Sequence, residues 1–182
     1  MDYADQYGRM HAKGKYFPGY SISPYVDAIA ELVKEHGTET ILDYGCGRGL
    51  QYLRRRVHEK WGGILPECYD PGVNGLHEMP ETGPYDAIIS TDVAEHIDEK
   101  DLPGVLQEMT DIVAANGFVF LSISCRPTKK TLPDGRDVHL TIRPPSWWKK
   151  LLSRYANPVR IVAHFDVAGH FDEPEEPWDS DA

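Results

Sequence analysis

The chain has 182 residues, which is the length of a single compact domain that can bury a substantial hydrophobic core. It carries 19 Lys and Arg residues against 29 Asp and Glu residues, and the net charge of −10 argues against a protein that binds extended nucleic acid or an anionic membrane. No apolar run approaches the roughly 20 residues of a membrane-spanning helix, and the acidic N-terminus lacks the apolar stretch of a signal peptide, so we expect a cytoplasmic protein.

The first third of the chain begins with an aromatic segment. Residues 1–24 hold four tyrosines, Tyr16 and Tyr20 among them, without a clean period, so we interpret them as an arm that packs over the rest of the chain. Apolar spacing and stop signals then predict a helix, a short buried strand and a second helix over 24–36, 40–43 and 50–59. The strand runs directly into a glycine-rich turn, which is a strand, turn and helix unit.

The rest of the chain continues the alternation of apolar strands with amphipathic helices. We predict strands over 64–69, 85–90, 118–124 and 159–167, with helices over 101–115 and 145–155. This alternation is typical of an α/β fold, in which a Rossmann-like, doubly wound and mostly parallel sheet is covered on both faces. We divide the chain into the arm over 1–24, one domain over 25–168 and an acidic, mobile tail over 169–182.

The glycine-rich turn carries the strongest functional signal of the sequence. Gly45, Gly47 and Gly49 allow the backbone to approach a ligand closely, next to the unpaired N–H groups of a helix N-terminus. A dinucleotide fingerprint needs a glycine where this chain has Leu50, so that fingerprint fails. Asp43 precedes the turn and would repel a pyrophosphate, whereas it would attract a ligand with an ammonium or sulfonium group.

Residues 41–49, with the sequence ILDYGCGRG, resemble the first motif of class I S-adenosylmethionine (SAM) dependent methyltransferases, LDxGCGxG. The likeness continues through residues 85–97 (YDAIISTDVAEHI), which resemble FDxIxxxxVLEHI, and through residues 117–123, which resemble GGxLLIS. The resemblance implies SAM as cofactor and S-adenosylhomocysteine (SAH) as product. It places Asp70 at the two ribose hydroxyls, and it assigns cofactor binding to Asp43, Gly45, Cys46, Gly47, Gly49, Asp70, Pro71, Asp92 and Val93.

Two segments depart from the family pattern. Only residues 71–84 separate Asp70 from Tyr85, which is too short for the helix and strand usually found there. We therefore assign no residue to the adenine ring. The residues after Val167 are rich in proline and acids, and we expect that they cannot supply the antiparallel last strand of the usual seven. The sheet is predicted to have five or six strands.

Acid–base candidates lie near the predicted acceptor side of the site. His139 is our first candidate for a general base, because it follows a strand in a long insertion, and Glu95 and His96 stand behind it. Each of the three has a structural alternative, as a polar loop residue or as a cap for the following loop. Candidate substrate contacts are Tyr16, Tyr20, Arg136, His139 and Trp148, although a tryptophan at this helical spacing also suits the core.

Three cysteines and eight histidines show no pairing at metal-ligand spacing, so the sequence predicts no metal. Alternatives to a methyltransferase of small molecules are a SAM-binding or SAH-binding module without activity and a methyltransferase of nucleotide or nucleic-acid bases. A nicotinamide-dependent oxidoreductase is disfavoured by Asp43 and Leu50.

The charge is unevenly distributed along the chain. Residues 161–182 contain seven acids and no Lys or Arg, whereas residues 126–160 contain nine bases and only two acids. The basic stretch includes His139 and Trp148, which we place nearest the acceptor. The basic stretch has an alternative interpretation as a solvated charged loop, but the distribution does not exclude a small phosphorylated or carboxylated substrate; extended nucleic acid and membranes stay outside the expected partners.

Overall fold

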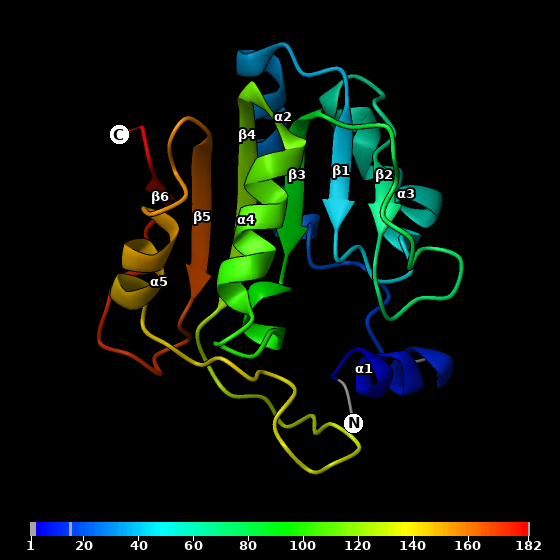
Figure 1. Ribbon diagram of the computed structural model, residues 1–182, viewed down its shortest axis with the longest axis vertical. Coiled ribbons are helices and arrows are strands. Elements are labelled where there is room, and N and C mark those ends of the chain that lie inside the picture. The colour runs from blue at the N-terminus through cyan, green and yellow to red at the C-terminus, as the bar shows by residue number, and fades with distance from the viewer. Residues whose placement is uncertain (1–2, 15, 182) are drawn as a thin grey trace.

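A single six-stranded sheet forms the centre of the computed structural model, which describes residues 3–14 and 16–181 (Figure 1). Residues 1, 2, 15 and 182, which belong to the predicted arm and tail, lie outside the described part. The strand order is β2-β1-β3-β4-β5-β6, and only the last pair is antiparallel. The strands are β1 (Ile41–Tyr44), β2 (Glu67–Tyr69), β3 (Tyr85–Thr91), β4 (Val113–Ser124), β5 (Arg160–Asp166) and β6 (Trp178–Asp179).

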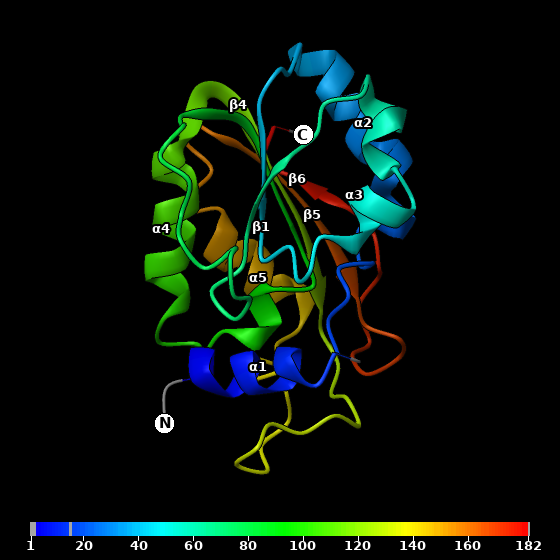
Figure 2. The ribbon, with the colours of Figure 1, turned by 90° about the vertical axis from the view of Figure 1, so that its right-hand side faces the viewer.

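Helices cover both faces of the sheet, which confirms the predicted α/β, Rossmann-like class. α4 and α5 lie on one face and α2 and α3 on the other, while α1 crosses the end of the sheet at which β1 and β3 finish (Figures 1 and 2). The helices are α1 (Tyr3–Ala12), α2 (Val26–His36), α3 (Leu50–Arg54), α4 (Leu102–Ile112) and α5 (Pro145–Leu152), with single 3₁₀ turns η1 (Ser23–Tyr25), η2 (Val57–Trp61) and η3 (Ala94–His96).

The strands are apolar because helices cover both faces of the sheet. Successive strand residues point to opposite faces, so Leu42 and Ile88 pack under α4 while Ile41 and Ile89 pack under α2. All four side chains are 2% exposed or less. No helix of the described residues is long and apolar enough to cross a membrane.

Several predicted boundaries shift for local reasons. The helix predicted over 101–115 ends at Ile112, because the chain enters β4 at Val113 and pairs with Tyr85. The helix predicted over 50–59 breaks into α3 and η2 at Arg56, whose φ is +51°. α1 was not predicted, since its sequence shows little apolar period. Residues 71–84 contain no helix or strand, as their short length suggested.

The acidic tail is an ordered edge of the sheet, so the expectation that it supplies no antiparallel strand is wrong. β6 pairs antiparallel with β5 through Ala163 and Trp178. Arg160, on β5, forms ion pairs with Asp179 at 2.7 Å and with Glu35 at 2.8 Å. Backbone N–H groups of Val167 and Ala168 donate to Glu175. Two acids of the tail, Asp179 and Glu175, are thus held by a guanidinium and by backbone amides, and the mobility of the tail stays a prediction.

We expect Asp179→Asn to lower the free energy of unfolding by about 1 kcal/mol, because the Arg160 side chain is only 17% exposed and would lose one of its two charged partners, the other being Glu35. Urea unfolding monitored by circular dichroism measures the change. Glu176→Gln, at an exposed position of the same tail, is the control and should leave the midpoint unchanged. Equal behaviour of the two variants would contradict this role of Asp179.

Candidate functional site

A cavity of about 470 Å³ opens where β1, β2 and β3 end, within the size range of small-ligand pockets. The order of the sheet reverses between β1 and β3, which is where parallel α/β sheets bind their ligands. α1 and the segment after it pass over this end of the sheet (Figure 2). The lining includes Asp43, Gly45, Cys46, Gly47, Gln51, Asp70, Pro71, Gly72, Asp92, Val93, His96 and Lys130.

The turn after β1 forms the floor of the cavity, and its glycines are required by close approach. A Cβ on Gly45 would lie 2.4 Å from a methyl group of Val93, and a Cβ on Gly47 would lie 2.6 Å from the Phe17 carbonyl oxygen. Both glycines also have positive φ, at 81° and 58°. The N–H groups of Gly45 and Cys46 donate to the carbonyl oxygen of Tyr69, which fixes the turn against the end of β2.

Asp70 joins the two turns that border the cavity. One carboxylate oxygen accepts the N–H of Gly47 at 2.8 Å, and the other accepts the N–H of Gly72 at 2.9 Å. Burial raises the pKa of Asp70, and these N–H groups and His11 oppose the rise. Nε2 of His11 lies 3.7 Å away; because burial lowers the pKa of His11, that contact is weaker than a full ion pair.

Asp43 is buried at the end of β1, with 2% of its surface exposed. Gln51 and Tyr52 both donate to its Oδ2 at 2.8 Å. Burial nevertheless raises the pKa of Asp43 to about 7, since desolvation outweighs these two bonds. A cation bound beside Asp43 would stabilise the ionised carboxylate.

Asp92 follows β3 in a left-handed conformation, with φ of 54°, which non-glycine residues adopt at a cost. Ser122, near the end of β4, stabilises this conformation: its hydroxyl donates to Oδ1 of Asp92 at 2.8 Å, and its carbonyl accepts the Asp92 N–H at 3.0 Å. Burial raises the pKa of Asp92. A third carboxylate is thereby positioned on the wall of the cavity.

Aromatic side chains from the N-terminal segment close the opposite wall. Phe17 packs edge-on against Tyr7 and against His96, with ring centroids 5.8 Å and 5.5 Å apart. The guanidinium of Arg55 lies 4.0 Å over the ring of Tyr20. Three carboxylates and these aromatic side chains therefore line one cavity.

A comparison with models of known protein families identifies the family of this chain. The model of the methyltransferase domain family matches residues 16–175, which is nearly the whole chain. The chain belongs to this methyltransferase family. The match confirms the resemblance to class I enzymes that the first motif indicated. No curated protein and no solved structure matches the chain.

The predicted cofactor residues of this methyltransferase gather at the cavity with one exception. Gly49 is absent from the lining: it begins α3 in a left-handed conformation, and its N–H donates to the Cys46 carbonyl. The Cys46 thiol is buried, and its pKa is raised, so the chain does not prepare it as a nucleophile.

The three acid–base candidates also come together. One ligand atom from each of Glu95, His96 and His139 lies within 4.8 Å of the other two. His96 lines the cavity, whereas Glu95 and His139 stand behind it. Burial lowers the pKa of His139 and lowers that of His96 to about 3, so both rings are neutral at pH 7.

The predicted substrate contacts separate into different places. Tyr20 lines the cavity, whereas Tyr16 packs against the small cluster around Met10. Arg136 is exposed and pairs with Asp134. Trp148 is fully buried under the sheet, so its prediction as a substrate residue is wrong; its apolar helix face packs into the core instead.

Several residues that line the cavity were not among the predicted site residues. Tyr7 and His11 lie four residues apart, which places them on one face of α1, and this spacing could have indicated a helix over the site. Gln51 is polar and fully inside, at 2% exposure, because it bonds Asp43. Lys130 reaches the cavity from the loop after β4.

We expect Asp43→Asn to raise the free energy of unfolding of the ligand-free chain at pH 8, by on the order of 1–3 kcal/mol, because it removes a buried charge. The pKa of Asp43 is about 7 in the folded chain, which is above its value in the unfolded chain. The free energy of unfolding of the wild type therefore falls as the pH rises toward 7, and Asp43→Asn avoids this loss. The gain should therefore shrink toward pH 5.

Thermal unfolding at pH 5, 6, 7 and 8 measures this difference. Asp27→Asn is the control, since the side chain of Asp27 is 91% exposed and its replacement should give no comparable pH dependence. A variant at position 43 that is less stable than the wild type at pH 8 would contradict the assigned ionisation.

Proposed function

We propose that this protein transfers a methyl group from SAM to an O, N or C atom of a small acceptor that carries a phosphate or carboxylate group. Membership of the methyltransferase domain family supports the reaction class. The observation that carries the cofactor is Asp70, a cavity residue whose two oxygens accept the N–H groups of Gly47 and Gly72.

The described residues fit SAM. Each oxygen of Asp70 uses one backbone donor and keeps capacity for a second, which matches a pair of ribose hydroxyls. Asp43 and Asp92 add negative charge to the same wall, which favours the ammonium and sulfonium groups of SAM. A pyrophosphate would meet three carboxylates, so this cavity disfavours a dinucleotide.

SAM supplies an electrophilic methyl group on a cationic sulfur, which departs as a neutral thioether. The protein therefore needs to align the acceptor and exclude water, more than to supply a nucleophile. Phe17, Tyr7 and Val93 surround the cavity with apolar surface suited to that exclusion. His96, on the wall after β3, faces the side from which an acceptor would approach.

Lys130 supports the anionic character of the acceptor. It lines the cavity from the loop after β4, with its Nζ 5.7 Å from the centroid of the Phe17 ring. The other nearby bases of this stretch are engaged elsewhere, since Arg126 pairs with Asp166 and Arg136 with Asp134. A phosphate or carboxylate on the acceptor would give Lys130 a charged partner.

Asp70→Ala should weaken SAH binding by about 100-fold or more, because it would remove the two hydrogen bonds that we assign to the ribose hydroxyls and also the bonds that orient the carboxylate through Gly47 and Gly72. Isothermal calorimetry with SAH measures the affinity. Glu81→Gln, at an exposed position of the same connection, should bind as the wild type does. A folded Asp70→Ala chain with unchanged SAH affinity, or a wild type stabilised by NAD and not by SAH, would overturn the cofactor assignment.

Lys130→Ala should lower kcat/KM for anionic acceptors by about tenfold and leave the SAH affinity unchanged. Transfer of labelled methyl from SAM to a panel of phosphorylated, carboxylated and neutral small molecules gives the measurement. Lys129→Ala is the matched control, since Lys129 is adjacent to Lys130 in the sequence but does not line the cavity. Preference for neutral acceptors, or equal losses in both variants, would refute this acceptor class.

A further inference from the structure

Two imidazoles and a carboxylate converge behind the acceptor side of the cavity. Glu95 and His96 belong to η3, after β3, and His139 belongs to the loop after β4. One ligand atom of each lies within 4.8 Å of the others. Three ligands at about 2.2 Å from one cation lie about 3.6 Å apart in a tetrahedral site, so the separations in this cluster need to contract by up to about 1.2 Å.

Both imidazole rings are held in the tautomer that a metal ligand needs. Nδ1 of His96 lies 2.8 Å from the carbonyl oxygen of Val138, and Nδ1 of His139 lies 2.6 Å from that of Arg126. A carbonyl only accepts, so each Nδ1 carries the hydrogen and each Nε2 keeps its lone pair. Carbonyl partners of this kind orient the histidine ligands of metal sites.

The carboxylate of Glu95 has an unused buried oxygen. Glu95 is fully buried, and its Oε1 accepts the N–H of Ser124 at 3.1 Å. Oε2 has no hydrogen-bond partner among the described residues. A buried carboxylate oxygen without a partner is costly, and a cation would supply what it lacks. The same burial raises the pKa of Glu95.

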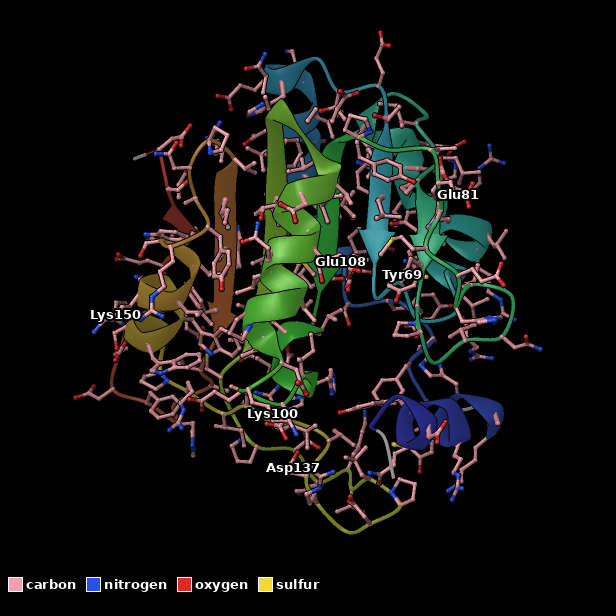
Figure 3. All side chains as sticks on the ribbon, viewed as in Figure 1. Tyr69, Glu81, Lys100, Glu108, Asp137 and Lys150 are labelled. Carbon is pink, nitrogen blue, oxygen red and sulfur yellow. The ribbon has the colours of Figure 1, made fainter. Side chains whose placement is uncertain are left out.

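The loop that carries His139 is fixed to the turn that carries the other two residues. Thr141 donates its N–H to the Glu95 carbonyl at 3.0 Å and its hydroxyl to the Ile97 carbonyl at 2.7 Å. Asp137, which is labelled in Figure 3 on the loop after β4, accepts the His139 N–H at 2.8 Å. Hydrogen bonds thus join the two segments that carry the three side chains.

We propose that Glu95, His96 and His139 bind one divalent first-row transition-metal ion at the edge of the cavity. Two neutral imidazoles and one carboxylate suit Zn²⁺, Fe²⁺, Co²⁺ or Mn²⁺, whereas Mg²⁺ and Ca²⁺ prefer oxygen ligands throughout. The sequence predicted no metal because His139 follows His96 by 43 positions, and only the fold brings them together.

This inference extends the proposed function and rests on it for its role. His96 lines the cavity next to Asp92 and Val93, so an ion held by its Nε2 would sit on the acceptor side. Three protein ligands leave positions open for an oxygen of the acceptor, whose pKa a cation would lower.

Metal binding to the EDTA-treated chain tests the proposal without any activity. We expect calorimetry with Co²⁺ and with Zn²⁺ to give one ion per chain, and bound Co²⁺ to show a visible ligand-field absorption. Glu95→Gln and His139→Gln should each weaken binding by at least about tenfold. Glu95→Gln keeps an oxygen that can accept the Ser124 N–H, and His139→Gln changes a side chain that is only half-buried. If one of these variants unfolds, the other still tests the site.

His164→Gln is the matched control, because His164 is also half-buried but lies on β5 outside the cluster. It should bind Co²⁺ as the wild type does. Substoichiometric binding by the wild type, wild-type affinity in both cluster variants, or an equal loss in His164→Gln would overturn the site.

SAH titration of the metal-free and metal-loaded chain separates the two proposals. SAH binding without metal binding would leave the proposed function in place and remove the metal site. Metal binding without SAH binding would do the reverse.

Discussion

The carboxylate of Asp70 is the contact on which the geometry of the site depends. It accepts backbone N–H groups from the turn after β1 and from the turn after β2, so one side chain sets the distance between them. The turn after β1 is held a second time by the Tyr69 carbonyl. Without Asp70, only the bonds to Tyr69 would hold the turn after β1, and the turn after β2 would lose its connection to Gly47.

The site concentrates three carboxylates that burial makes costly. Asp43, Asp70 and Asp92 each have a raised pKa in the ligand-free chain, and hydrogen bonds offset only part of the desolvation. Asp92 adds a strained backbone conformation. Such costs are typical of sites that are complementary to a cation, because the missing stabilisation comes from the ligand.

The sequence was sufficient for the parts of the site that follow one another along the chain. Asp43 and the glycines stand in a local motif, and Asp70 and Asp92 directly follow strands, so the α/β topology alone brings them to one edge. It was insufficient where a contact depends on distant segments. The helical spacing of Trp148 is the same for a core tryptophan and for one that contacts a substrate. The proximity of His139 to Glu95 depends on how the loop after β4 folds back.

α1 is hydrogen-bonded to that same loop. Gln6 exchanges hydrogen bonds with Asp134, through its amide nitrogen at 2.9 Å and its amide oxygen at 3.2 Å, and the Tyr7 hydroxyl donates to the Val138 carbonyl. A displacement of α1 from the cavity would therefore break these bonds or carry the segment with His139 along with it. Under the proposed function, release of the nucleoside and entry of the acceptor would then be coupled through the same three bonds.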